Sequence, residues 1–221
     1  MGSPSLICVF YKGHFVIAQP ARFGGYPAGQ GIVILNFLLN SANIERLKKG
    51  LQHIYTPSLR ELQKVNDDMD KKPSYLINPL VDPLKQLFNP IEHCRWPTLS
   101  CYIGGKILQV VAEGTTQNRI PIELHLDFAN DGISCEWAYV VDLDNSVFEV
   151  YAGAVPKINA TSKRFNDIGD KDSTVPALVR SYPFTKLPTV EEFTTVFSSE
   201  DLRDYSGEDG VKEHKEEKSK Q

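Results

Sequence analysis

Two runs of β-branched and aromatic residues open the chain, at positions 6–11 and 14–19, and Lys12-Gly13 separates them. Such residues favour strands, and a Lys-Gly pair between two strands is typical of a hairpin turn. The sequence therefore predicts a β-hairpin over residues 5–19. Residues 20–31 are crowded with glycine and proline, which excludes a regular element there.

Apolar residues then recur at helical spacing in three successive segments. The first segment begins near residue 32, the second has its apolar positions between Ile44 and Ile54, and a Ser58–Glu61 capping box opens the third. We expect helices from about residue 32 to residue 70, packed on the sheet. The proline-rich residues 72–98 predict a long ordered connection, with at most one helical turn near residues 84–88.

The second half of the chain returns to short elements. Residues 104–113 predict a short helix that ends at Gly114. Alternation over residues 120–128 predicts a strand, and a helix through residues 122–129 is the alternative. The clearest pattern is a β-hairpin over residues 133–152, which turns at Asp144-Asn145-Ser146. Its buried face is predicted to hold Cys135, Trp137, Tyr139, Val141 and Leu143.

Near the C-terminus, Thr189 and Glu192 predict the start of a last short helix. From residue 199 the chain is rich in charged residues and poor in apolar ones, so a disordered tail is expected over residues 199–221. The whole pattern predicts one α+β domain over residues 1–198, with a mainly antiparallel sheet and helices packed on it.

Composition excludes several classes of protein. The 221 residues carry a formal net charge of −4, which argues against binding to a nucleic-acid backbone. No apolar run is long enough to cross a bilayer, and no secretory signal is visible, so we expect a cytoplasmic protein with no membrane partner. Neither a partner nor an oligomeric state follows from the sequence.

The chain has four cysteines, which fit a reducing compartment. His93-Cys94 with Cys101 and Cys135 could form a zinc site, but their spacing contains no C-x-x-C or H-x-x-x-H unit. Structural thiols, with no metal and no cofactor, are therefore the expectation.

The best candidate for chemistry is the glycine-rich stretch at residues 22–31. Glycines before a helix let the backbone approach a ligand, and helix N-termini favour anions. The stretch matches neither a P-loop nor a dinucleotide fingerprint. A purely structural loop, in which Tyr26 and Pro27 pack, is the favoured alternative.

Glu136 is a second candidate, because it lies on the strand face opposite Trp137. A covered face would make it a buried carboxylate and a possible acid or base. A solvent-facing strand residue is the alternative.

Three segments together resemble a family of uncharacterised proteins from bacteria, phages and fungi. They are Ala18-Gln19 followed by Gly25-Tyr26-Pro27-Ala28-Gly29-Gln30-Gly31, then Pro97-Thr98-Leu99-Ser100 with Gly104, and Cys135-Glu136-Trp137-Ala138-Tyr139 with the strands around it. The resemblance spans roughly residues 5–155 and implies a shared fold without an activity. With the loop, it nominates as ligand-binding residues Gln19, Gly25, Tyr26, Gln30 and Glu136.

The chain departs from this family at two places. Where the family reads Gln-Trp-Asp, this chain has Arg22-Phe23-Gly24, and where the family reads Arg-Asp, it has Cys101-Tyr102. Either part of a site has been lost, or a structural ion-pair cluster has been replaced by apolar packing.

Two functional hypotheses follow. The first is a non-enzymatic cytosolic binding or interaction protein that uses residues 22–31 as its contact surface. The alternative is a hydrolase, because the order strand, Lys-Gly turn, strand, glycine loop and helix resembles the opening of N-terminal-nucleophile hydrolases. Their nucleophile is the first residue of the mature chain, so Ser3 or Ser5 would have to be exposed by cleavage. No catalytic residue is assigned.

Overall fold

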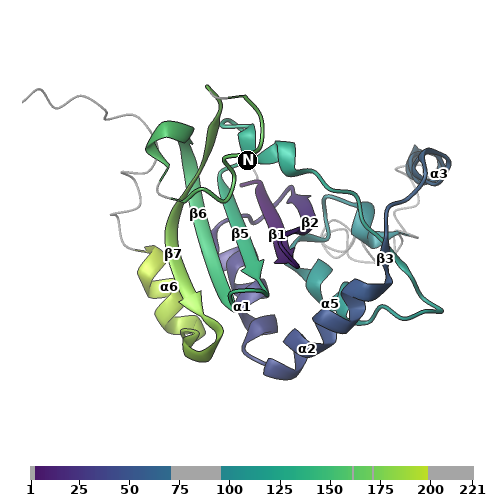
Figure 1. The fold of residues 1–221 in the computed structure, drawn as a ribbon, viewed down its shortest axis with the longest axis horizontal. Helices are drawn as coiled ribbons and strands as arrows, with labels where there is room; N and C mark the ends of the chain where they lie inside the picture. Colours follow the sequence, from purple (N-terminus) through teal and green to yellow (C-terminus); the bar gives the residue numbers. More distant parts are fainter. Residues whose placement is uncertain (1–2, 71–95, 161, 171, 199–221) are drawn as a thin grey trace, which may run out of the picture.

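A five-stranded sheet forms the centre of the fold in the computed structural model, which describes residues 3–70, 96–160, 162–170 and 172–198 (Figure 1). The strands lie in the order β2-β1-β5-β6-β7. Strands β1 and β5 are parallel, and the other neighbours are antiparallel. The bounds of the strands are β1 Ser5–Tyr11, β2 His14–Ala21, β5 Trp137–Asp142, β6 Val147–Pro156 and β7 Thr174–Pro183.

This arrangement confirms the predicted α+β class, the mainly antiparallel sheet and both hairpins. The tail predicted over residues 199–221 lies outside the described residues, and so do residues 72–95 of the predicted long connection, with its helical turn near residues 84–88. No helix in the described ranges is both long and apolar enough to span a bilayer.

The helices are short and mostly follow the predicted segments. The α-helices are α1 Ile32–Leu38, α2 Ser41–Gly50, α3 Leu59–Asp70, α5 Ile107–Ala112 and α6 Val190–Ser198. A π-helical turn, Pro27–Gly31, leads into α1. Short 3-10 turns occupy Leu51–His53, Pro97–Leu99, Gly104–Lys106, Leu126–Asn130, Lys157–Asn159 and Phe184–Lys186. The last α-helix begins as predicted, since Thr189 and Glu192 form a reciprocal capping box.

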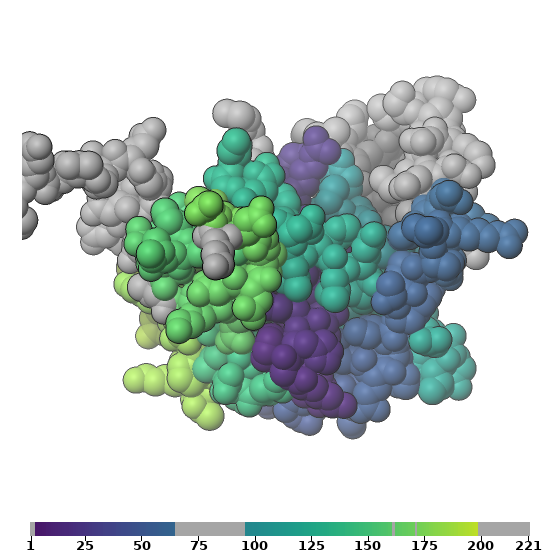
Figure 2. Space-filling model, turned by 45° about the horizontal axis from the view of Figure 1, so that its top comes forward, coloured from purple at the N-terminus to yellow at the C-terminus, as the bar shows by residue number. Residues whose placement is uncertain are grey.

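Both faces of the sheet are buried. One face packs against α1, α2, α5 and α6, with Tyr139 and Phe148 fully buried at its centre, and α1 lies behind the sheet in Figure 1. The other face is covered by residues 126–135 and 162–168, and the buried centre on this face includes Tyr151 of β6 and Phe165. Figure 2 shows the connection after β6 in green on the surface of the molecule. Because two faces are covered, β5 reads as a nearly continuous apolar run.

The strand predicted over residues 120–128 is wrong, and so is the alternative helix over 122–129. Only β4, Ile120–Pro121, is extended, and it pairs in parallel with β3, Ile54–Tyr55. Leu126–Asn130 then forms a 3-10 turn. The alternation did not mark a single buried face, because Ile122 is buried whereas Leu124 is 49% exposed.

The prediction that the third helix packs on the sheet is also wrong. Helix α3 lies at the edge of the molecule, away from the sheet (Figure 1), and its first residue, Leu59, is 80% exposed. The helix begins through local contacts, because the Glu61 carboxylate accepts hydrogen bonds from the Ser58 backbone N–H at 2.8 Å and from its hydroxyl at 2.7 Å. Capping thus specified the helix without specifying where it docks.

Cys135 does not share a face with Trp137, contrary to the sequence pattern. It lies before the first residue of β5, and its side chain belongs to the buried cluster on the other face of the sheet. Tyr139, Val141 and Leu143 do share the predicted buried face. Trp137 itself is only partly buried at its edge.

Candidate functional site

The glycine loop, residues 22–31, connects β2 to α1 and is tied to the centre of the sheet. The Gly25 N–H donates to the Ser3 carbonyl at 2.7 Å, and the Tyr139 hydroxyl donates to the Gly25 carbonyl at 2.6 Å. Gly25 is buried, and a Cβ at this position would lie 2.4 Å from the Ser3 carbonyl oxygen. Gly25 is therefore needed for the close passage of the two backbones, so its role in the structure is packing.

Gln30 joins the loop to a distant segment. Its amide nitrogen donates to the Phe23 carbonyl at 3.0 Å, and its amide oxygen accepts the Gly105 N–H at 2.7 Å. Gly104 has a φ of +52°, and a Cβ there would lie 2.3 Å from the Gln30 amide oxygen. The amide of Gln30 is thus committed to internal hydrogen bonds on both sides.

Gln19 is enclosed as well. It is 3% exposed, and its amide nitrogen donates to the carbonyl oxygens of Pro20 and Ser100, both at 3.3 Å. These bonds tie β2 to the segment that follows residue 96. A ligand would have to displace them to reach this side chain.

The backbone N–H groups of the loop do not form an anion cradle at the positions we can follow. The Gly29 N–H donates to the Tyr26 carbonyl, and the Gln30 N–H donates to the Gly24 carbonyl, both at 2.8 Å. Together with the bond from Gly25 to Ser3, they leave these three N–H groups satisfied within the protein. A ligand or partner would therefore have to contact the loop through side chains and not through these three backbone N–H groups.

Aromatic side chains are what the loop offers to solvent. Phe23 is 51% exposed and Tyr26 is 50% exposed, whereas Pro27 is buried. The Phe23 ring stacks on Tyr102 with a centroid distance of 5.8 Å. The Arg22 guanidinium also contacts the Phe23 ring, at 5.8 Å from its centroid. We call Arg22, Phe23, Tyr26 and Tyr102 the loop surface.

Sequence reasoning nominated Tyr26 and placed the contact surface at residues 22–31, but it did not single out Phe23 and did not include Tyr102. Tyr102 could not be included from spacing, because its segment is distant in the sequence. The structure brings the two segments together: the rings stack, and the Arg22 N–H donates to the Cys101 carbonyl at 2.9 Å. In this chain the two segments meet through aromatic packing.

Glu136 is exposed, as the solvent-facing interpretation expects. Its carboxylate accepts a hydrogen bond from the Ser3 hydroxyl at 2.5 Å. Since the Ser3 carbonyl also accepts the Gly25 N–H, Glu136 lies near the base of the glycine loop. The structure therefore places Ser3, Gly25 and Glu136 next to one another.

A second polar cluster, which no sequence pattern indicated, lies on the other face of the sheet. The Arg164 guanidinium donates to Asp142 at 2.6 Å and to Glu149 at 2.9 Å. The Tyr151 hydroxyl donates to Glu149 at 3.0 Å and lies 3.0 Å from the Ser162 hydroxyl. The side chain of Asp142 is fully buried and that of Arg164 is 13% exposed, so each charge is compensated within the protein.

The pKa values in this cluster shift in the directions that the contacts dictate. Burial alone would raise the pKa of Asp142, but hydrogen bonds from Asn145 and the charge and hydrogen bond of Arg164 lower it below its ordinary value. Burial and the neighbouring Glu149 carboxylate raise the pKa of Tyr151. The cluster is thus an ion pair with a neutral phenol beside it at physiological pH.

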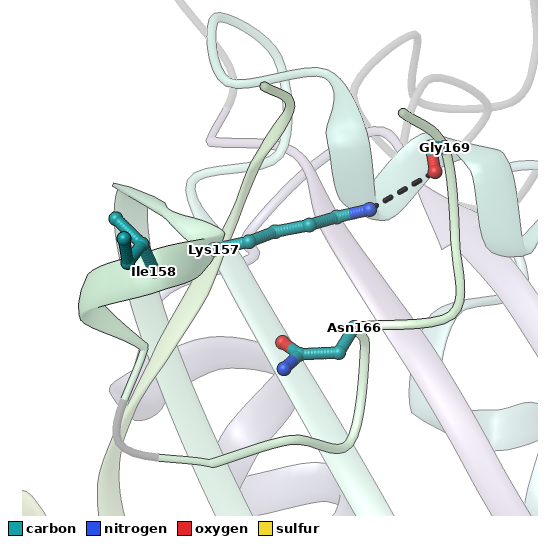
Figure 3. Close-up of a pocket in the computed structure, with 4 residues that line it drawn as sticks. All are labelled: Lys157, Ile158, Asn166 and Gly169. Atoms are coloured by element: carbon teal, nitrogen blue, oxygen red, sulfur yellow. Dashed lines mark hydrogen bonds between the residues drawn. The ribbon is translucent and has the colours of Figure 1, made fainter. Parts of the chain in front are cut away.

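A small cavity of about 270 Å³ lies nearby and is lined by Lys157, Ile158, Asn166 and Gly169 (Figure 3). The Lys157 ammonium extends across it and donates to the carbonyl oxygens of Gly169, at 3.0 Å, and of Ile168. The Asn166 side-chain oxygen is buried and has no hydrogen-bond partner within the described residues. The Lys157 ammonium is already bonded to the two backbone carbonyl oxygens, which makes the cavity a poor anion site.

Metal binding finds no support in the described part of the chain, where no group of three or more His, Cys, Asp or Glu side chains could hold an ion. His93 and Cys94 lie outside it. Cys8, Cys101 and Cys135 are free thiols. Burial raises the pKa of Cys8 well above its ordinary value and that of Cys135 to about 12, so neither is a reactive thiolate in the folded protein.

Comparison of the chain with protein-family models, with curated proteins and with solved structures found no match. The function must therefore be argued from the geometry of the chain itself.

Proposed function

We propose that this protein is a non-enzymatic binding or interaction protein of the cytosol, and that it contacts a partner protein through the loop surface. One observation carries the proposal: the glycine loop exposes half of Phe23 and half of Tyr26 on a backbone whose hydrogen bonds are internal. The free thiols Cys8, Cys101 and Cys135 support a reducing compartment.

The composition of the loop surface suits protein recognition. Tyrosine, other aromatics and arginine are enriched where binding energy concentrates in protein interfaces. Arg22 has no ion-pair partner within the described residues, so its charge is available to a partner. Its stacking on Phe23 and the stacking of Phe23 on Tyr102 restrict these side chains before binding.

Rigidity matters for the strength of such an interaction. Ordering a mobile side chain on binding costs about 0.5–1.5 kcal/mol, and a loop that is already ordered avoids part of that cost. Gln30 and Tyr139 hold the loop at two points, through Gly105 and Gly25. The structure therefore has the features of a preformed contact surface.

The test is site-specific photocrosslinking in cells of the source organism. A photoreactive amino acid would replace Tyr26 in one version of the protein and Ile158 in another. Ile158 is the matched control because it is 92% exposed and belongs to a different connection. We expect discrete crosslinked products from position 26 that Phe23→Ala weakens, and none of the same mass from position 158.

Absence of any product from position 26 would refute a stable contact at the loop surface. The same set of products from both positions would show non-specific encounter, which also contradicts the proposal.

A second candidate function rests on the hydrogen bond between the Ser3 hydroxyl and the Glu136 carboxylate. If processing made Ser3 the first residue, its own amine would lie beside its hydroxyl as the base that an N-terminal-nucleophile-like hydrolase needs. Glu136 already accepts a hydrogen bond from this hydroxyl and would help to orient it. The test is mass spectrometry of the N-terminus of the natural protein, followed by labelling with a fluorophosphonate. A natural chain that begins before Ser3, or labelling that persists in Ser3→Ala, would exclude this function.

A further inference from the structure

Residues 162–170, here called the strap, cover the second face of the sheet with little regular structure. One side chain of the strap, Phe165, is fully buried, and its ring contacts Phe15 of β2 at 5.7 Å and Tyr151 of β6 at 5.2 Å between centroids. Since β1 and β5 lie between β2 and β6, Phe165 crosses the middle of the sheet.

The row of the sheet between the two contacts of Phe165 contains Cys8 and Val140. In the register of the sheet, Cys8 of β1 pairs with Val140 of β5, which pairs with Glu149 of β6. Cys8 is completely buried and belongs to the same apolar cluster as Phe165. Phe10, two residues further on the same face, carries the Arg164 guanidinium 4.8 Å from its ring centroid.

Arg164 is the main polar attachment of the strap to the sheet. It bridges Asp142 at the end of β5 and Glu149 in β6, and Ser162 adds a contact to the Tyr151 hydroxyl. The groups with charge or titration that face Arg164 are Asp142, Glu149, Tyr151 and Cys8. Arg164 needs both carboxylates, because removing either one leaves a buried charge poorly paired.

The rest of the strap is less well attached. The cavity of about 270 Å³ lies against Asn166 and Gly169, and the Asn166 side-chain oxygen lacks a partner within the described residues (Figure 3). Lys157 holds the carbonyl oxygens of Ile168 and Gly169, but it belongs to the same connection and not to the sheet centre. Phe165 and the partly buried Ile168 are the two apolar side chains that residues 162–170 pack on the sheet. Segments with so few buried apolar contacts open at a lower free energy than the core does.

We propose that the strap opens as a unit while the sheet stays folded, with Arg164 as its latch, and that this opening controls access to the Cys8 thiol. Closed, the strap keeps Cys8 away from solvent and from any oxidant or electrophile. Open, it leaves Cys8 as an accessible thiol on a folded protein. Reaction of the Cys8 thiol therefore depends on whether the bridge from Arg164 to Asp142 and Glu149 is intact.

The experiment is native-state thiol labelling of the full chain with iodoacetamide, resolved for each cysteine by peptide mass spectrometry. Cys135 belongs to the same buried cluster as Cys8, so the comparison is global unfolding of the same protein, followed by circular dichroism in the same urea series. Partly exposed Cys101 reports the rate of unhindered reaction. The measured quantity is the urea dependence of the Cys8 labelling rate below the unfolding transition, compared with the urea dependence of global unfolding.

In the natural sequence we expect the Cys8 rate to depend only weakly on urea, since local opening exposes little surface, whereas labelling through global unfolding would rise with the full slope of that transition. Arg164→Ala should raise the Cys8 rate at least tenfold beyond the rise that its loss of global stability accounts for. Lys163→Ala, at an exposed neighbouring position on the same strap, should leave the Cys8 rate unchanged.

A Cys8 rate with the same urea dependence as global unfolding in the natural sequence would overturn the proposal, because Cys8 would then react only through global unfolding. A rise in the Cys8 rate of Arg164→Ala no larger than its loss of global stability accounts for would overturn the role of the latch. Should Arg164→Ala fail to fold, the urea dependence in the natural sequence still decides whether the strap opens by itself.

Discussion

The side-chain oxygen of Gln30 accepts the backbone N–H of Gly105 at 2.7 Å, although the two residues are 75 positions apart in the sequence. The nitrogen of the same amide donates to Phe23 within the loop. One side chain thus fixes the glycine loop to the segment that leads into α5. Residue 104 must be glycine for this contact, because a Cβ there would collide with the Gln30 amide.

Replacing Gln30 should cost stability. In Gln30→Ala the Gly105 N–H and the Phe23 carbonyl lose their partner, and we expect a loss of about 1–3 kcal/mol in the free energy of unfolding. Urea denaturation followed by circular dichroism would measure it. Gln109→Ala is the control, because the Gln109 side chain donates to the exposed Glu113 carboxylate one turn further on, and its loss should change stability by less than about 0.5 kcal/mol. A neutral Gln30→Ala would mean that the amide is free to serve a ligand.

Tyr139→Phe should destabilise the protein through the other attachment of the loop. The hydroxyl is buried, its pKa is raised by burial, and it donates to the Gly25 carbonyl. Removing it leaves that carbonyl without its partner, at a cost of about 1–3 kcal/mol. Tyr26→Phe removes a hydroxyl from a half-exposed ring and should be close to neutral in the same denaturation assay. Equal effects of the two variants would contradict the buried role of Tyr139.

The two large aromatics of the central hairpin should differ. Phe148 is fully buried and contacts Tyr139 and Phe193, so Phe148→Ala should cost about 3–5 kcal/mol. Trp137 retains some exposure beside Phe197, so Trp137→Ala should cost less, about 1.5–3 kcal/mol. The pattern alone ranks the two positions alike, and the denaturation midpoints of both variants would separate them.

Periodicity predicted the elements whose signal is local. The hairpin turns at Lys12-Gly13 and Asp144-Asn145-Ser146 and the capping pairs at Ser58 and Thr189 all form through neighbouring residues, and they stand where the sequence put them. Strand β7 was not predicted, and its Pro176 and Pro183 are residues that weigh against a strand. An edge strand tolerates proline, but edge position is a property of the whole sheet and not of the local sequence.

The candidate site shows the same division. Glycine spacing identified the loop. It could not show that the side chains of Gln19 and Gln30 are hydrogen-bonded to Ser100 and Gly105, since those partners come from a distant segment. The Arg164 cluster escaped for the same reason: Asp142, Glu149 and Arg164 lie on three separate elements, and no spacing rule joins them. Only the register of β5 with β6 brings the two carboxylates within reach of one guanidinium.

The pH dependence of stability should carry the signature of Asp142. Its pKa is lower in the folded protein than in the unfolded chain, despite burial, because Asn145 and Arg164 stabilise the carboxylate. The ionised form therefore contributes stability above the unfolded pKa of about 3.9, and this contribution is lost as the pH falls through the lower folded value.

Asp142→Asn should cost up to about 3–5 kcal/mol at pH 7, the range for breaking a buried ion pair, with Glu149 left to pair Arg164. Urea midpoints measured from pH 7 to pH 2.5 should converge for this variant and the natural sequence below pH 4, whereas Asp127→Asn, at an exposed position, should follow the natural sequence throughout. A gap between Asp142→Asn and the natural sequence that stays constant down to pH 2.5 would show that the carboxylate charge is not what the cluster uses.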